Sequence, residues 1–173
     1  MIFIYNKDME TLRRDHSFGK IINKDSKILI LGSFPSLKSV EVSFYYGHPQ
    51  NRFWDILAAL YDEPGLKAYS NEKKTEFLAK NRIALYDVID SCLIKGSSDL
   101  SIDRKSIVYT DILNLIKGTD IRKIFLNGNK AFELFSRKYP ELADISVKLP
   151  STSPANAKMR LDDLIEQWKI IKE

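Results

Sequence analysis

One stretch of the chain decides the fold: Ile28-Leu29-Ile30-Leu31-Gly32-Ser33-Phe34-Pro35-Ser36. Its first half is a continuous apolar run, which is typical of a strand buried on both faces of a sheet. Its second half is a loop of small and kinked residues, where glycine lets a ligand approach the backbone and proline fixes a turn. A buried strand that leads into such a loop indicates a pocket at the end of the strand.

Three further apolar runs lead into turn signals, so we expect strands at residues 27–31, 83–88, 123–126 and 145–149. Between them, helical patterns cover residues 52–61, 72–80, 106–117 and 130–138. A last helix carries apolar residues at helical spacing that we expect in the core: Leu161, Leu164, Ile165, Trp168 and Ile171. The alternation predicts an α/β fold, a three-layer α/β/α sandwich with a central, mainly parallel four-stranded sheet.

The composition narrows the class of protein. The 173 residues contain no linker or repeat, so we expect a single domain over residues 1–173. The single cysteine excludes an internal disulfide and a multi-cysteine metal site, and two histidines argue against zinc. No apolar run approaches the ~20 residues of a membrane span and the chain opens on no signal-peptide pattern, so we expect a cytoplasmic protein. The net charge of +4 favours an anionic partner.

Ligands of open parallel sheets bind beyond the carboxyl ends of the strands, which selects the loops at residues 32–51, 87–98, 127–129 and 150–156. The hydroxyl-rich loop 150–156 suits a phosphate backbone, and a plain capping loop is the competing interpretation. Asn127 would emerge where the polar edge of a ligand lies, or would only bond its own turn.

The loop after the first strand ends in a block of aromatic and amide residues: Tyr45-Tyr46-Gly47-His48-Pro49-Gln50-Asn51-Arg52-Phe53-Trp54. The tyrosines and the histidine offer flat faces on which a base could stack, worth about 1–3 kcal/mol per base, or the tyrosines simply cover a sheet edge. Asn51 precedes the expected helix and is a favoured cap, which does not prevent it from facing a pocket. Phe53 and Trp54 should anchor that helix in the core, with Arg52 either solvated or on a phosphate.

Together these pieces resemble the uracil-DNA glycosylase superfamily, and most closely its hypoxanthine-DNA glycosylase (DNA-deoxyinosine glycosylase) family. The matching pieces are His16-Ser17-Phe18, residues 29–36, residues 45–54, Phe125-Leu126-Asn127-Gly128 and residues 149–156. Two positions depart from the wider superfamily. Phe34 stands where most members carry an asparagine or aspartate that positions water, and Leu149 stands where a histidine or asparagine begins the second motif.

The resemblance implies a monofunctional hydrolase that flips a deaminated base, preferably hypoxanthine, out of DNA and leaves an abasic site without nicking the strand. It implies that Asn51 and Asn127 take over catalysis, one orienting water and the other contacting the base in either order. It places the base among Gly32, Ser33, Phe34, Tyr46 and His48, with Tyr46 stacking on it. The loop that enters the DNA would comprise Pro150, Ser151, Thr152, Ser153, Pro154, Ala155 and Asn156. We expect no metal, no cofactor and a monomer.

Three other functions stay open at this stage. The histidine-proline block also occurs in mismatch-specific uracil glycosylases, so excision of uracil or mismatched thymine is the nearest alternative. A non-catalytic protein that binds damaged DNA through the same groove would show salt-dependent binding without base release. A nucleotide-binding module of flavodoxin-like topology would bind a free mononucleotide.

Overall fold

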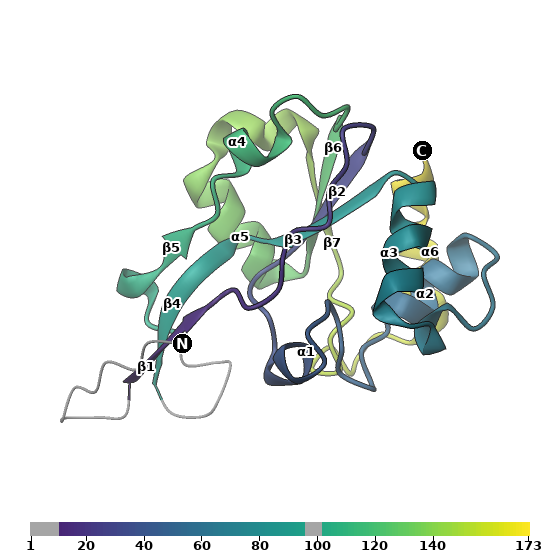
Figure 1. Cartoon of the computed structure of the whole chain (residues 1–173), viewed down its shortest axis with the longest axis horizontal. Helices are drawn as coiled ribbons and strands as arrows, with labels where there is room; N and C mark the ends of the chain where they lie inside the picture. Colours follow the sequence, from purple (N-terminus) through teal and green to yellow (C-terminus); the bar gives the residue numbers. More distant parts are fainter. Residues whose placement is uncertain (1–10, 96–101) are drawn as a thin grey trace.

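A four-stranded parallel sheet forms the centre of the molecule. The computed structural model describes residues 11–95 and 102–173. The sheet has the strand order β3-β2-β6-β7 (Figure 1). Every neighbouring pair is parallel, so all four strands end at the same edge. The four predicted strands are confirmed, with bounds close to those expected: β2 (Ile28–Gly32), β3 (Ile83–Asp87), β6 (Lys123–Asn127) and β7 (Ser146–Leu149).

Helices cover both faces of this sheet, so the predicted three-layer sandwich is confirmed (Figure 1). Alternate residues of β2 show how the layers are held together. Ile30 is fully buried against the cluster that contains α2 and α6, whereas Leu29 and Leu31 are fully buried in the cluster that contains α4 and α5. The layers consist of α2 (Phe53–Leu60), α3 (Asn71–Lys80) and α6 (Leu161–Trp168) on one face and α4 (Ile112–Ile116) and α5 (Asn129–Lys138) on the other.

A second, antiparallel sheet extends the face that carries α4 and α5, and the sequence did not predict it. Its strand order is β1-β4-β5, with β1 (Thr11–Asp15), β4 (Ile89–Lys95) and β5 (Val108–Tyr109). The expected helix at 106–117 is therefore wrong over its first half, because β5 occupies part of it and α4 begins only at Ile112. The expected loop at 87–98 is wrong over β4, and residues 96–98 lie outside the described residues.

Short elements complete the chain: α1 (Leu37–Glu41), η1 (Leu66–Ala68), η2 (Arg104–Ser106), η3 (Pro140–Ile145) and η4 (Lys169–Lys172). In the last helical segment Leu164, Trp168 and Ile171 are buried as expected and Ile165 is partly buried. Leu161 is 38% exposed, so its predicted place in the core is wrong. It is the first residue of α6, where the chain has just left the loop that precedes the helix.

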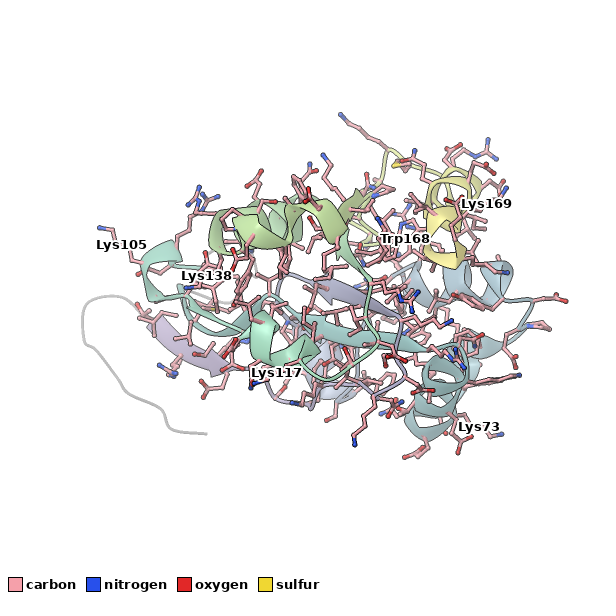
Figure 2. All side chains as sticks on the ribbon, turned by 90° about the horizontal axis from the view of Figure 1, so that it is seen from above. Lys73, Lys105, Lys117, Lys138, Trp168 and Lys169 are labelled. Carbon is pink, nitrogen blue, oxygen red and sulfur yellow. The ribbon has the colours of Figure 1, made fainter. Side chains whose placement is uncertain are left out.

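Charged side chains occupy the outside of the molecule. Figure 2 shows the labelled lysines around its periphery, whereas Trp168 lies within the folded body, where it is fully buried. Within the part of the chain that the structure describes, no helix is long and apolar enough to cross a membrane.

Candidate active site

A pocket of about 760 Å³ opens at the carboxyl edge of the parallel sheet. Its lining comes from the loops after β2, β6 and β7 and from the end of β3, which is the position expected for a ligand site in an open parallel sheet. Most of the residues named from the sequence lie on it: Gly32, Ser33, Phe34, Tyr46, Asn51, Asn127, Pro150, Ser151, Thr152, Ser153, Ala155 and Asn156.

Two of the named residues, His48 and Pro154, are not on the lining of this pocket. His48 is partly buried, and its ring Nδ1 accepts the backbone N–H of Gln50 at 3.1 Å. This bond stabilises the turn before α2. Because the ring is engaged in the turn, the structure gives His48 a local role and does not bring it to the cavity.

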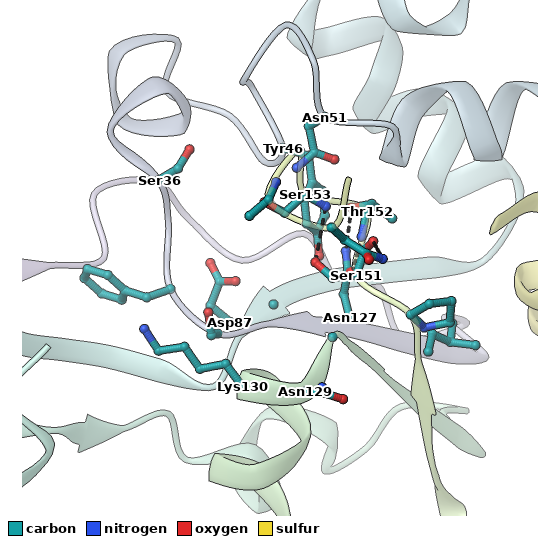
Figure 3. A pocket seen from close by; sticks show the side chains of 18 of the residues that line it. Ser36, Tyr46, Asn51, Asp87, Asn127, Asn129, Lys130, Ser151, Thr152 and Ser153 are labelled. Carbon is teal, nitrogen blue, oxygen red and sulfur yellow. Dashed lines mark hydrogen bonds between the residues drawn. The ribbon is translucent and has the colours of Figure 1, made fainter. Parts of the chain in front are cut away.

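Asn127, the last residue of β6, makes a double hydrogen bond with Thr152. Its side-chain N–H donates to Thr152 Oγ1 at 3.0 Å, and its Oδ1 accepts the Thr152 backbone N–H at 3.0 Å. An amide has two N–H donors and two carbonyl lone pairs, so Asn127 keeps one donor and one acceptor for a ligand. The pair joins the end of β6 to the loop 150–156 and fixes the side-chain plane of Asn127 (Figure 3).

Gly128 allows the loop to approach β6 this closely. Its φ of +96° is a conformation that side chains rarely adopt, and a Cβ there would lie 2.9 Å from the Cβ of Ser151. Its backbone N–H donates to the Leu149 carbonyl at 2.9 Å, so the turn after β6 is bonded to the start of the loop. Only glycine meets both requirements.

Asn51 lies at the N-terminus of α2 and also on the pocket. Its Oδ1 accepts the backbone N–H of Phe53, the first residue of α2, at 3.0 Å. The N-cap position belongs to Arg52, because the helix begins at Phe53 rather than at the expected Arg52, so the predicted capping position of Asn51 is wrong by one residue. The bond to Phe53 uses the carbonyl oxygen of Asn51, so it orients the amide without consuming its two N–H donors.

The Arg52 side chain clamps the loop 150–156 from the other side. Its guanidinium donates to the backbone carbonyls of Ser153 at 2.8 Å and Asn156 at 2.9 Å, and also to those of Thr152 and Met159. Neither of the expected roles, solvation or a phosphate contact, fits this geometry. The two apolar neighbours behave as predicted, since Phe53 is fully buried and Trp54 is 2% exposed.

Tyr46 has an unusual backbone and an unpaired hydroxyl. Its φ is +55°, which is uncommon outside glycine and tends to occur at functional positions. One face of its ring stacks on Phe53, with centroids 3.9 Å apart. Among the described residues its buried hydroxyl has no hydrogen-bond partner. Burial first, and then the charge of Asp87, raise the pKa of Tyr46, while the nearby Asn127 amide acts to lower it.

Asp87, the last residue of β3, is a pocket residue that sequence reasoning did not single out. It is 4% exposed, and its Oδ2 accepts a hydrogen bond from His16 Nε2 at 2.9 Å. The His16 ring stacks on Tyr86 with centroids 4.5 Å apart. The only signals in the sequence were the position of Asp87 at a strand end and the place of His16 in a piece that resembles the superfamily.

A central parallel sheet with its pocket at the strand ends defines this chain as a ligand-binding α/β protein of the open-sheet class. The chain belongs to the uracil DNA glycosylase superfamily, because the profile described as "Uracil DNA glycosylase superfamily" matches residues 20–172.

Proteins of similar length resemble this chain. A hypoxanthine DNA glycosylase of Methanosarcina acetivorans is 34% identical to this chain, in an alignment that covers 82% of this chain and 87% of the relative. A hypoxanthine DNA glycosylase of Methanosarcina barkeri is 32% identical, in an alignment that covers 69% of this chain and 75% of the relative. A solution NMR structure from Methanosarcina acetivorans, of a protein proposed to be a uracil DNA glycosylase, superposes with a TM-score of 0.74 at 30% identity. The superposition covers 92% of this chain and 99% of the other.

Proposed function

We propose that this protein is a DNA glycosylase that flips a deaminated base, hypoxanthine in preference, out of DNA and hydrolyses its N-glycosidic bond. The names of the two Methanosarcina relatives support this substrate. The observation that carries the proposal is that Asn51, Asn127 and the loop 150–156 line one cavity although they lie far apart in the sequence. A base inside a stacked duplex is out of reach of such a cavity, so the nucleotide must leave the stack.

The two departures from the superfamily pattern leave the chemistry to other residues. Leu149 is 3% exposed, and Phe34 lies beneath the guanidinium of Arg14, with 5.3 Å between the guanidinium carbon and the ring centroid. Neither side chain has a polar group with which to hold water. Asn51 and Asn127 are pocket amides that already have a fixed orientation, through the backbone N–H of Phe53 and through Thr152. A third pocket amide, Asn156, is engaged with the Ser151 carbonyl of its own loop.

Cleavage passes through a sugar with oxocarbenium character, while negative charge grows on the departing base. In the proposed mechanism Asn51 orients the attacking water at the sugar, and the free N–H of Asn127 donates to the base as it leaves. Such donors are effective because they are oriented before the reaction begins. No covalent intermediate with lysine is needed, so the product is an abasic site in an unbroken strand.

The loop 150–156 would enter the duplex where the base has left. Its shape is held by bonds within the protein, including Trp168 Nε1 donating to the Pro150 carbonyl at 3.0 Å and Asn156 Nδ2 donating to the Ser151 carbonyl at 2.9 Å. Ala155 is exposed on this loop, and the exposed side chains of Lys158 and Arg160 follow it. These cations suit the phosphates on either side of a flipped nucleotide.

The test is base release under single-turnover conditions from matched oligonucleotides that carry one deoxyinosine, one deoxyuridine or neither, with alkaline cleavage of abasic sites. The proposal predicts release from deoxyinosine above all. Release mainly from deoxyuridine would assign the chain to uracil excision. Tight, salt-dependent DNA binding without release of any base would contradict the proposed catalysis and identify a damage-binding protein.

A further inference from the structure

The backbone around the buried carboxylate of Asp87 is hydrogen-bonded to both neighbouring segments. Asp87 pairs with Gly32 in the register of β3 and β2, and the next residue, Val88, donates its N–H to the Gly32 carbonyl at 2.9 Å. Thr110 Oγ1 donates to the Asp87 carbonyl at 2.8 Å. A Cβ on Gly32 would lie 2.3 Å from Asp87 Oδ1, so the carboxylate occupies the space that a side chain would take. The absence of a side chain at Gly32 therefore leaves room for this carboxylate.

The two oxygens of the carboxylate have different surroundings. Oδ2 accepts the hydrogen bond from His16, whose side chain is 2% exposed. Oδ1 accepts no hydrogen bond from any of the described residues, although Asp87 lines the pocket. A nearly buried carboxylate is costly unless its oxygens are satisfied. An acceptor without a protein donor, on a residue that lines the cavity, is available to a donor that a ligand brings.

We propose that Asp87 reads the flipped base, with Oδ1 accepting the ring N–H that a deaminated purine carries. This inference rests on the proposed function. Hypoxanthine has an N–H at ring position 1, whereas adenine has a lone pair there. Oδ1 attracts the first and repels the second, because an ionised carboxylate is an acceptor only. The carboxylate thus separates the damaged base from its parent at the one ring atom where their hydrogen-bonding character is reversed.

The position of Asp87 in the pocket fits the base rather than the sugar. Figure 3 shows Asp87 next to the strand ends, whereas Asn51 lies farther from them. An extruded base enters ahead of its sugar, so the group beside the strands meets the base and the group nearer the entrance meets the sugar. Ring position 1 is in the six-membered ring, away from the nitrogen that bonds the sugar. A carboxylate at that edge therefore lies at a distance from the atom where negative charge first develops.

His16 is the positioning residue of this arrangement. Because a carboxylate only accepts, Nε2 of His16 carries the hydrogen of their bond, and this bond selects which oxygen faces the pocket. The ring is itself held by Tyr86 and by the edge of Phe18, at centroid distances of 4.5 and 4.8 Å. Its buried Nδ1 has no partner among the described residues. A buried polar atom without a partner is uncommon in folded proteins, so this one calls for an explanation.

The experiment compares excision of hypoxanthine with excision of 1-methylhypoxanthine, in which a methyl group replaces the ring hydrogen. Single-turnover rates are measured for the wild-type chain and Asp87→Ala on oligonucleotides that carry one of the two bases. The wild-type chain should prefer deoxyinosine by roughly tenfold to a hundredfold, the range expected for a hydrogen bond to a charged group. In Asp87→Ala the preference should fall to near unity, since both the acceptor and the steric barrier to the methyl group are gone.

Asp144→Ala is the matched control, because Asp144 is an exposed aspartate in η3. It should keep the wild-type preference. Asp87→Asn keeps the size of the side chain and is the second variant should the alanine variant not fold. The neutral amide oxygen of asparagine forms hydrogen bonds about half as strong as those of a carboxylate, so the preference for hypoxanthine over 1-methylhypoxanthine should fall several-fold.

His16→Gln and His16→Phe test the positioning role. Glutamine can still donate to Oδ2 and should retain most of the preference, whereas phenylalanine should lose it. Loss of rate in both variants with an unchanged preference would mean that His16 acts on the fold alone, and would overturn its positioning role.

The outcomes separate this inference from the proposed function. A wild-type chain that releases no base from deoxyinosine would overturn both. If the wild-type chain releases hypoxanthine but Asp87→Ala slows both substrates by the same factor, the carboxylate acts at the sugar or on the fold, and the base-reading role is wrong. An Asp87→Ala variant with unchanged rates on both bases would overturn it as well.

Discussion

The two sides of the pocket differ in how their polar groups are satisfied. On the loop side, defined by Arg52, Asn127 and Thr152, hydrogen bonds within the protein fix the side chains and the backbone of the loop 150–156. On the strand side, defined by His16, Tyr46 and Asp87, the described residues leave His16 Nδ1 and the Tyr46 hydroxyl buried without a partner. The loop side therefore sets the shape of the cavity, and the strand side holds the buried polar atoms that the described residues leave without a partner.

The largest effect is expected from removing the fixed amides of the pocket. Asn51→Ala and Asn127→Ala should each lower the single-turnover rate of excision roughly a hundredfold or more, as does removal of one preorganised donor elsewhere. Saturating enzyme separates the chemical step from DNA affinity. Asn114→Ala, at an exposed asparagine of α4, should keep the full rate. Full rates in both pocket variants would show that the amides only shape the cavity.

The next effect concerns the Arg52 clamp. Arg52→Ala removes the donors to the loop carbonyls and should lower the free energy of unfolding by about 2–4 kcal/mol, measured by urea denaturation. Arg52→Lys should recover only part of this, since one ammonium cannot replace a planar fork of donors. Arg122→Ala removes an exposed arginine and should change stability by less than about 0.5 kcal/mol. Equal urea midpoints for Arg52→Ala and Arg122→Ala would contradict a stabilising clamp.

A smaller effect is expected at Gly128, where loop and strand approach each other. Gly128→Ala should cost about 1–3 kcal/mol, from the positive φ and from the contact with Ser151. Gly118→Ala measures the cost of the positive φ alone, because Gly118 has a φ of +75° and open space around its Cβ position. Adding Ser151→Gly should restore part of the loss. A double variant no more stable than Gly128→Ala would mean that the close approach is not the cause.

The smallest effect concerns Tyr46 and depends on pH. Tyr46→Phe removes a hydroxyl with no partner among the described residues, so near pH 7 its stability should lie within about 1 kcal/mol of the wild type. The folded protein holds the pKa of Tyr46 above its ordinary value of 10.0, by burial first and by the charge of Asp87 second. The wild type therefore loses stability as the pH rises above about 10, where the unfolded tyrosine ionises and the folded one does not.

The variant lacks this loss, so its stability relative to the wild type should increase between pH 9 and pH 11 (~1 kcal/mol or more). Urea denaturation at several pH values measures the difference. A constant difference over that interval would mean that the buried hydroxyl does not titrate as proposed.

The parts of the fold that could be predicted are those with a local signal. Three strands of the central sheet, β2, β3 and β6, are mostly buried and consist largely of apolar residues, so their bounds were predicted nearly correctly. The edge strand β7 is only partly buried, and its bounds were also predicted to within a residue. The second sheet has no such signal. The strand β1 has the sequence TLRRD, and β5 is only two residues long. Both depend on antiparallel pairing with β4, and β1 and β4 are far apart in the chain. Periodicity cannot show a long-range pairing of this kind.

The same distinction applies to the site. Asn51 and Asn127 could be named because they stand in motifs next to a helix or a strand end. The His16–Asp87 pair joins residues that are 71 positions apart, so neither side chain indicates the other in the sequence. The sequence analysis named Arg52 but not its partners, because the loop carbonyls that it binds become its neighbours only when α6 packs beside α2. Site residues that stand in local motifs could therefore be predicted from the sequence, whereas hydrogen bonds between segments that packing brings together could not.

In the proposed function, the bond from Trp168 to the Pro150 carbonyl and the Arg52 clamp would affect how the protein searches DNA. Because these bonds order the loop 150–156 in the absence of DNA, little conformational entropy would be lost on its proposed entry into a duplex. Encounters with intact base pairs should then be brief and reversible, without a folding step at each one. The time spent at a site would be decided by the base itself, through how readily it leaves the stack.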